Sequence, residues 1–262
     1  MIKSIDIIDK YPQIKNATFE EAQKLYSLYD VLMSNMELST LIYDVLGFQV
    51  EKDSDSRKII NAITNYNYPN EIAIKSSFIN NILLKQKSQI TIFELNTGNC
   101  RADLCKINGK STVYEIKTDL DNFKRLNKQL NEYSSIFEEV YIICSNNRVN
   151  EVLQMVPEYI GIYSYRFTNK RNYRFEKIRN ANISKNINNL KQLNVLTRRE
   201  KDYYSLSESS NVVDVNKYLK IALKERYREK WQFLSKNSNS IYEIDYQWFY
   251  KNRLNPEIVY TY

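Results

Sequence analysis

Two carboxylates and a lysine in the middle of the chain, Asp103, Glu115 and Lys117, have the types and spacing needed for phosphodiester chemistry. They fall within residues 101–117, where Asn108-Gly109 separates two short alternating runs, a pattern that predicts a β-hairpin. Because alternate side chains of a strand share a face, Glu115 and Lys117 should lie side by side. Carboxylates can hold Mg²⁺ or Mn²⁺, and a lysine can orient or deprotonate an attacking water.

The same residues also have a simpler interpretation, as the solvated face of a half-exposed strand. The sequence after the strand favours the catalytic interpretation. Asp119 and Asp121 are good helix N-cap residues, and they precede apolar or small residues at three- and four-residue steps, namely Phe123, Leu126, Leu130, Ser134 and Phe137. This pattern predicts an amphipathic helix. Gln129 and Tyr133 are four residues apart on it and should share one face.

The order of these residues resembles the PD-(D/E)xK nuclease superfamily: Asp103, an eleven-residue gap, then Glu115-Ile116-Lys117. Gln129 and Tyr133 are similar to the Gln-x-x-x-Tyr helix motif of the RecB-like and VRR-NUC-like branch. The resemblance implies a restriction-endonuclease-like fold and a nuclease that uses Mg²⁺ or Mn²⁺. It also implies site roles: metal ligation by Asp103, Glu115 and the Ile116 carbonyl, water activation by Lys117, and substrate positioning by Gln129 and Tyr133.

A third acid would complete the metal site. Members of this superfamily often place an acidic residue on the helix before the first core strand, which by resemblance points to Glu71. Glu94, on the predicted strand Ile90 to Leu95, is the other candidate. Glu71 can equally be a glutamate favoured at a helix start by the helix dipole, so the choice between the two acids stays open.

The hairpin contains an internal conflict. A plain two-residue turn at Asn108-Gly109 would place Asp103 opposite Tyr114, and hence on the other face from Glu115. A register offset by one, through a three-residue loop that adds Lys110 or a bulge near Asp103, would bring the carboxylates together. We expect the offset register, with the two carboxylates about 3 to 5 Å apart and one cation shared at about 2.1 Å.

Several residue types are absent or scarce, which excludes whole classes of function. The chain has no histidine, so Ser-His-Asp, Cys-His and HNH mechanisms are unavailable, as are zinc proteases and zinc deaminases as usually built. Its four glycines are too widely spaced for a Walker A or GxGxxG loop, so no nucleotide cofactor is expected. The three cysteines should be reduced and buried. No signal peptide or membrane span is evident, and we expect a cytoplasmic protein.

Positive charge is concentrated in the C-terminal part. Residues 166–262 hold 20 basic and 10 acidic residues, whereas residues 1–165 hold 18 and 21. The segment 166–179 alternates six basic residues with aromatics, which favours phosphate contact over a merely solvated surface. The candidate nucleic-acid-binding residues are Arg101, Arg125, Lys170, Arg171, Arg174, Lys177 and Arg179.

The predicted fold is α/β, a mixed sheet flanked by helices with helical additions at both ends. We expect a helical segment over 1–66, a nuclease-like core over 67–168, and a basic, mainly helical region over 169–262. The predicted function is metal-dependent hydrolysis of DNA, with RNA as the less favoured substrate. The alternative is a module of the same fold that binds nucleic acid or protein without cutting. Nothing in the sequence indicates the oligomeric state.

Overall fold

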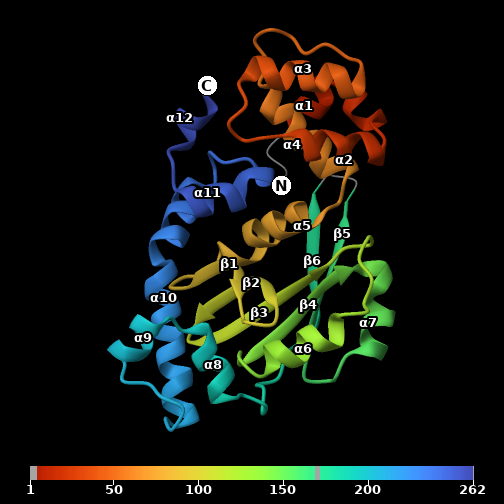
Figure 1. Ribbon diagram of the computed structural model, residues 1–262. Coiled ribbons are helices and arrows are strands. Elements are labelled where there is room, and N and C mark those ends of the chain that lie inside the picture. The colour runs from red at the N-terminus through yellow and green to blue at the C-terminus, as the bar shows by residue number, and fades with distance from the viewer. Residues whose placement is uncertain (1–4, 169–171, 262) are drawn as a thin grey trace. The chain divides into compact units, whose positions relative to one another are not determined.

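The computed structural model describes residues 5–168 and 172–261 (Figure 1). The chain divides into two compact units, each built from separate segments of sequence. The helical unit comprises the described residues of 1–81, 167–173 and 233–262, and the sheet unit comprises 82–166 and 174–232. This division differs from the three consecutive parts expected, because the C-terminal helices belong to the same unit as the N-terminal ones.

The helical unit is built from short helices whose ends are marked in the sequence. Thr18 and Ser34 each form a capping box, Asp55 caps the next helix, and Gly47 ends the helix before it with φ +70°. Its elements are α1 (Ile5–Lys10), η1 (Pro12–Asn16), α2 (Phe19–Leu28), α3 (Asn35–Leu46), α4 (Ser56–Asn67), α5 (Glu71–Phe78), η4 (Glu243–Asp245), α11 (Tyr246–Asn252) and α12 (Pro256–Tyr260). Buried apolar side chains of α1 to α4 pack together as its core.

A buried carboxylate lies inside this unit. Asp245 is 1% exposed, and its oxygens accept hydrogen bonds from the Tyr29 hydroxyl at 2.9 and 3.0 Å and from the Tyr260 hydroxyl at 2.7 Å. Burial raises the pKa of Asp245 to about 6; the two tyrosine hydrogen bonds and the Arg57 charge act against that rise, and Glu243 adds to it.

The raised pKa gives a pH prediction. Folded Asp245 binds its proton more tightly than the unfolded residue, so its favourable contribution is complete below about pH 4 and is lost as pH rises through about 6. The free energy of unfolding of wild type minus that of Asp245→Asn should therefore fall by about 2 kcal/mol between pH 4 and pH 7. Urea unfolding at a series of pH values measures the difference, and a constant or rising difference would contradict the assignment.

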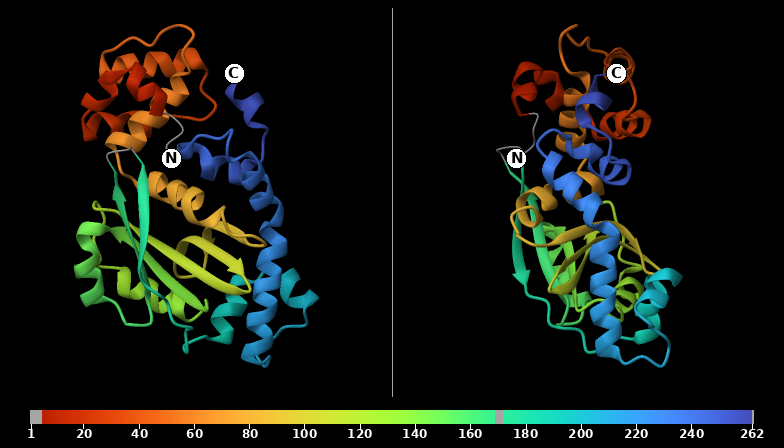
Figure 2. Two further views of the ribbon diagram at one scale, coloured as in Figure 1. Left: turned by 180° about the vertical axis from the view of Figure 1, so that it is seen from behind. Right: turned by 90° about the vertical axis from the view of Figure 1, so that its left-hand side faces the viewer.

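The sheet unit contains a six-stranded sheet in the order β1-β2-β3-β4-β5-β6 (Figures 1 and 2). β1 to β3 are antiparallel neighbours, whereas β3, β4 and β5 run parallel. The strands are β1 (Ile90–Asn96), β2 (Arg101–Asn108), β3 (Lys110–Lys117), β4 (Glu139–Ser145), β5 (Gly161–Phe167) and β6 (Tyr173–Arg179). The mixed sheet with flanking helices confirms the predicted fold class.

The β2–β3 hairpin has the offset register that the sequence required. Leu104 pairs with Tyr114 and Ile107 with Ser111, one residue away from the register of a plain two-residue turn. Asn108 pairs with Lys110, and Gly109 between them is in the left-handed region at φ +72°. The expectation of an irregular hairpin is confirmed.

Other segments of the sheet unit differ from expectation. α6 begins at Leu126 rather than next to Asp119 and Asp121, because the Asp121 carboxylate accepts hydrogen bonds from the Thr118 backbone N–H and hydroxyl, both at 2.8 Å, and so holds a turn. The basic stretch 173–179 adds a strand to the sheet, although the region from 169 onward was expected to be mainly helical. The remaining elements, some of which cross into the helical unit, are η2 (Ile79–Leu83), α6 (Leu126–Ser134), η3 (Asn146–Arg148), α7 (Val149–Met155), α8 (Asn189–Val195), α9 (Arg198–Tyr203) and α10 (Val212–Asn237).

All three cysteines are free thiols; Cys105 and Cys144 are buried as expected, whereas Cys100 is partly exposed. Among the described residues, no helix is both long and apolar enough to cross a membrane.

Candidate metal and substrate site

The strand register places three acidic residues in one line across neighbouring strands. In the β1–β2 ladder, Phe93 pairs with Leu104 and Leu95 pairs with Ala102. Glu94, between them, therefore lies opposite Asp103. In the β2–β3 ladder, the last pair is Leu104 with Tyr114. The next residues along the two strands, Asp103 and Glu115, therefore lie opposite each other. Since directly opposite residues share a face of the sheet, all three side chains belong to the same face.

Glu94 and Asp103 form a close acidic pair within this line. A carboxylate oxygen of each lies within 4.8 Å of one of the other, and both residues are partly buried. Glu94 has a φ of +53°, a left-handed conformation that is unusual for a non-glycine residue inside a strand. Such backbone strain costs about 1–3 kcal/mol and is concentrated at functional sites. Arg101 approaches Glu94 from the exposed side, with Nε 2.6 Å from Oε2.

Glu115 is held by the residues that the sequence singled out. It is 2% exposed, and its Oε1 lies 2.6 Å from Lys117 Nζ and accepts a hydrogen bond from Gln129 Nε2 at 2.6 Å. Its Oε2 accepts from the Tyr133 hydroxyl at 2.9 Å. Lys117 also donates to Gln129 Oε1 at 3.1 Å. β3 and α6 therefore bring Glu115, Lys117, Gln129 and Tyr133 into one hydrogen-bonded group.

Two backbone groups fix this geometry further. Asp103 Oδ2 accepts the Ile116 N–H at 2.6 Å, a contact that joins β2 to β3 beyond their last paired residues. The Tyr133 hydroxyl lies 3.0 Å from the Arg101 carbonyl oxygen. Burial, followed by the Glu115 charge, raises the pKa of Tyr133, so its hydroxyl keeps its proton and serves as a donor to Glu115.

The oxygen donors fit a hard divalent cation. Mg²⁺ and Mn²⁺ prefer carboxylate, carbonyl and water oxygens, and Glu94 with Asp103 supplies two such carboxylates at close range. Glu115 is not a member of the close acidic set around Glu94 and Asp103, because its oxygens face Lys117, Gln129 and Tyr133. The expected 3 to 5 Å approach of Asp103 and Glu115 stays a prediction.

Glu71, the alternative third acid, lies in the helical unit. It occupies the first turn of α5, and its Oε1 pairs with Lys75 Nζ at 2.6 Å. Of the two acids that the sequence left open, Glu94 is the one that belongs to the same unit as Asp103 and lies on the neighbouring strand.

The candidate phosphate contacts fall into three groups. Arg101, Arg125 and Arg174 are exposed, and the Arg101 side chain retains 72% of its accessible surface. Lys177 is exposed as well, with its ammonium over the Tyr141 and Tyr163 rings at 6.0 and 5.5 Å.

Arg179 has a structural role instead, because it donates to the Ile160 carbonyl at 2.8 Å and the Pro157 carbonyl at 2.9 Å. Burial lowers the pKa of its guanidinium. Lys170 and Arg171 lie outside the described residues.

One residue that holds the site in place was not predicted from the sequence. Glu132, on α6, is 6% exposed, and its Oε2 pairs with Lys191 Nζ from α8 at 2.7 Å. Asn99, in the β1–β2 loop, donates to its Oε1 at 3.3 Å. These contacts hold α6, and with it Gln129 and Tyr133, against the end of the sheet. A glutamate next to Tyr133 carries no recognisable signal in the sequence, because helix surfaces commonly bear charges.

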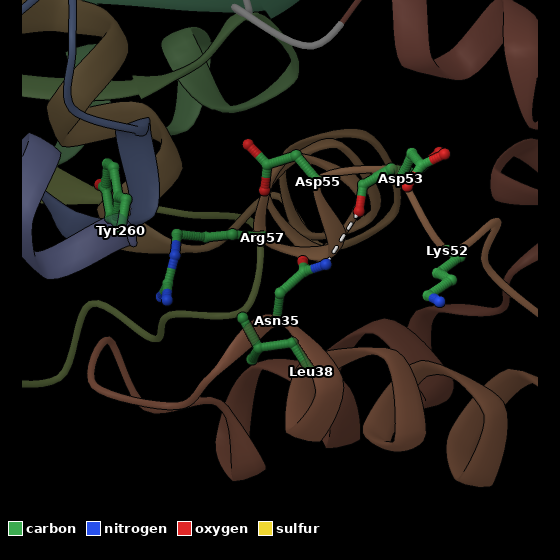
Figure 3. A pocket seen from close by; sticks show the side chains of 8 residues that line it. Asn35, Leu38, Lys52, Asp53, Asp55, Arg57 and Tyr260 are labelled. Atoms are coloured by element: carbon green, nitrogen blue, oxygen red, sulfur yellow. Dashed lines mark hydrogen bonds between the residues drawn. The ribbon is translucent and has the colours of Figure 1, made fainter. Parts of the chain in front are cut away.

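The helical unit has a separate hollow of about 320 Å³ (Figure 3). Charged side chains that line it form hydrogen bonds within the protein: Arg57 donates to the Val31 and Met33 carbonyls at 2.9 and 2.8 Å, and Asp55 caps α4. Asn35 donates to the Ser54 carbonyl at 3.1 Å. We therefore assign this hollow a structural role.

Comparison with known proteins identifies relatives of the chain. The profile of the family described as bacteriophage P4 protein cII matches residues 64–249, which include the whole sheet unit. Protein cII of Enterobacteria phage P4 is 34% identical over 100 residues, a stretch that covers 38% of this chain and 38% of that protein. A solved protein of unknown function from Silicibacter pomeroyi has 16% identity and a TM-score of 0.32, over 43% of this chain and 73% of that one.

Proposed function

We propose that this chain, which belongs to the bacteriophage P4 protein cII family, is a metal-dependent nuclease that hydrolyses phosphodiester bonds in DNA. The observation that carries the proposal is the line Glu94–Asp103–Glu115 across three strands, with Lys117 directly at Glu115. These residue types, on one face of one sheet, are those of the PD-(D/E)xK pattern.

In the proposed reaction, Glu94, Asp103 and the Ile116 carbonyl would hold Mg²⁺ or Mn²⁺. Such a cation polarises the phosphoryl oxygen and lowers the pKa of a bound water. Glu115 would share in this ligation or orient the water.

Lys117 would orient or deprotonate the water and offset the negative charge that develops on phosphorus. Hydrogen bonds with Gln129 and Tyr133 hold the side chains of Glu115 and Lys117 in place on β3. Arg101, on the open side of the acids, would meet the phosphate backbone.

A cleavage assay tests the proposal. Purified protein is incubated with single- and double-stranded DNA and RNA in the presence of Mg²⁺, Mn²⁺ or EDTA. We expect DNA to be cut with either metal and to survive in EDTA. No cleavage of any substrate with either metal would reject the nuclease proposal.

One observation favours a second candidate, a binding module that does not cut. Both Glu115 oxygens are engaged by Lys117, Gln129 and Tyr133, which is also what a structural ion pair inside a sheet would look like. A protein that binds DNA in EDTA with unchanged affinity after Mn²⁺ addition, and cuts nothing, would be this module.

The basic segment gives a salt-dependent prediction. Arg171→Glu with Arg174→Glu should weaken DNA binding and reduce the slope of log affinity against log salt by about two, one for each lost phosphate contact. Fluorescence anisotropy in EDTA, at several salt concentrations, measures the slope.

The matched control is Lys15→Glu with Lys24→Glu, which reverses two exposed charges in the helical unit. We expect the control to keep the wild-type slope. Equal slopes in all three proteins would mean that the 166–179 segment only faces solvent.

A further inference from the structure

An exposed tyrosine at the end of α9 contacts a stack of aromatic rings that α9, the residue after it and α10 contribute. Tyr203, the last residue of α9, is 80% exposed. Its ring meets the Tyr204 ring edge-on, with centroids 4.9 Å apart and an interplanar angle of 86°.

The rings beneath Tyr203 are fixed in place. Tyr204 stacks on Tyr218 of α10 at 4.9 Å and 25°, and its hydroxyl donates to Glu225 Oε2 at 2.7 Å. The Lys217 ammonium lies 5.2 Å from the centre of the Tyr218 ring. Because its support is ordered, Tyr203 can offer a ring face with little loss of conformational entropy on binding.

Basic side chains adjoin this stack. Lys217 and Lys224 line a hollow of about 400 Å³ on α10, whose apolar lining includes Ile107, Val213 and Ile221. Lys220 lines the same hollow, but its ammonium contacts the Gly109 carbonyl and Glu138 at 3.0 Å and serves the fold. On α9 the Arg198 side chain is 94% exposed and lies 3.9 Å from the Asp202 carboxylate. The stacked tyrosines therefore have Lys217 directly beside them and the Lys217–Lys224 hollow on the same helix, on a surface that also carries Asp202 and Glu225.

We infer that Tyr203, Tyr204 and Tyr218, with Lys217 and Lys224, form a platform that binds single-stranded nucleic acid. A polyanion complements the lysines, and an unpaired base can stack on the exposed ring, a contact that every base can make. A duplex keeps its base faces inside the helix and has nothing to place on Tyr203. This inference rests on the proposed function, because it names the form of nucleic acid that the protein binds. The single strand would bind at a place separate from the carboxylate site.

Binding of labelled oligonucleotides in EDTA tests the platform without cleavage. The probes are a thymidine 15-mer, an abasic 15-mer with the same phosphates, and a 15-base-pair duplex. Tyr203→Ala should weaken binding of the thymidine strand by about fivefold or more, since stacking on an aromatic side chain contributes about 1–3 kcal/mol per base. It should leave the affinities for the abasic strand and the duplex within about twofold, because neither offers a base face.

Two variants control for structure and chemistry. Tyr203→Phe should retain wild-type affinity, since stacking needs the ring and not the hydroxyl. Tyr43→Ala removes another exposed tyrosine, in α3 of the helical unit, and should change nothing.

The platform is rejected if the wild type does not bind the thymidine strand, or if Tyr203→Ala binds all three probes like the wild type. A loss that is equal for thymidine and abasic strands would also reject it, in favour of a purely electrostatic surface. These results are independent of the nuclease proposal, because binding in EDTA needs no cleavage and Tyr203 belongs to α9.

Discussion

Lys117→Ala should abolish DNA cleavage while leaving DNA binding nearly unchanged. The Lys117 ammonium is the group positioned to act on water, and removing one such charge-stabilising group typically costs a hundredfold to a thousandfold in rate, or about 3–4 kcal/mol. Single-turnover cleavage with Mg²⁺ measures the rate, and anisotropy in EDTA measures the binding. Wild-type cleavage in this variant would remove Lys117 from the mechanism.

The stability of the Lys117→Ala variant has to be measured together with its activity, because Lys117 is a buried residue and not a surface lysine. It is 8% exposed and pairs with the 2% exposed Glu115, so its loss removes the paired cation from a buried carboxylate that also accepts hydrogen bonds from Gln129 and Tyr133. We expect the free energy of unfolding to fall by about 1–3 kcal/mol.

Lys110→Ala is the matched control. Lys110 lies on the same hairpin and forms an exposed ion pair with Glu139 at 2.7 Å, so this variant should keep both stability and activity.

Asp103→Asn should remove metal binding and activity while preserving the hairpin. The asparagine side-chain oxygen can still accept the Ile116 N–H, which Asp103 Oδ2 accepts at 2.6 Å, but it no longer offers a charged metal ligand. The loss of several kcal/mol of charge stabilisation corresponds to at least a thousandfold lower rate. Calorimetric titration with Mn²⁺ measures the affinity for the metal, and cleavage measures the rate.

Glu94→Gln and Glu71→Gln decide between the two acids that the sequence left open. Because Glu94 lies opposite Asp103 on the neighbouring strand of the same unit, Glu94→Gln should weaken Mn²⁺ binding more than Glu71→Gln does. The reverse result would assign the third ligand to Glu71. Unchanged Mn²⁺ affinity in Asp103→Asn would contradict the metal site as a whole.

The sequence predicted the parts of this site that local chemistry controls. The alternation of side chains along a strand predicted which residues of β3 share a face. The requirement that Asp103 and Glu115 share a face then predicted the offset register of the hairpin. Four-residue spacing placed Gln129 and Tyr133 together, and both contact Glu115.

The sequence did not predict features that depend on distant partners. Asp121 has the residue type of a helix cap, yet it closes a turn on Thr118, so α6 starts later than expected. The basic 173–179 segment becomes a strand because the edge of β5 is available for pairing, which its charge does not reveal. The left-handed Glu94 and the Glu132–Lys191 pair depend in the same way on neighbours far along the chain.

The most direct test of the account is to locate the metal. Crystals of the wild type grown with Mn²⁺ should show an anomalous difference peak about 2.1–2.2 Å from a carboxylate oxygen of Asp103, with Glu94 or Glu115 as a second ligand. The same data from Asp103→Asn should lack the peak. A Mn²⁺ ion bound elsewhere, or no peak at Asp103 under conditions in which the protein cuts DNA, would contradict the central claim that these strand carboxylates form the catalytic metal site.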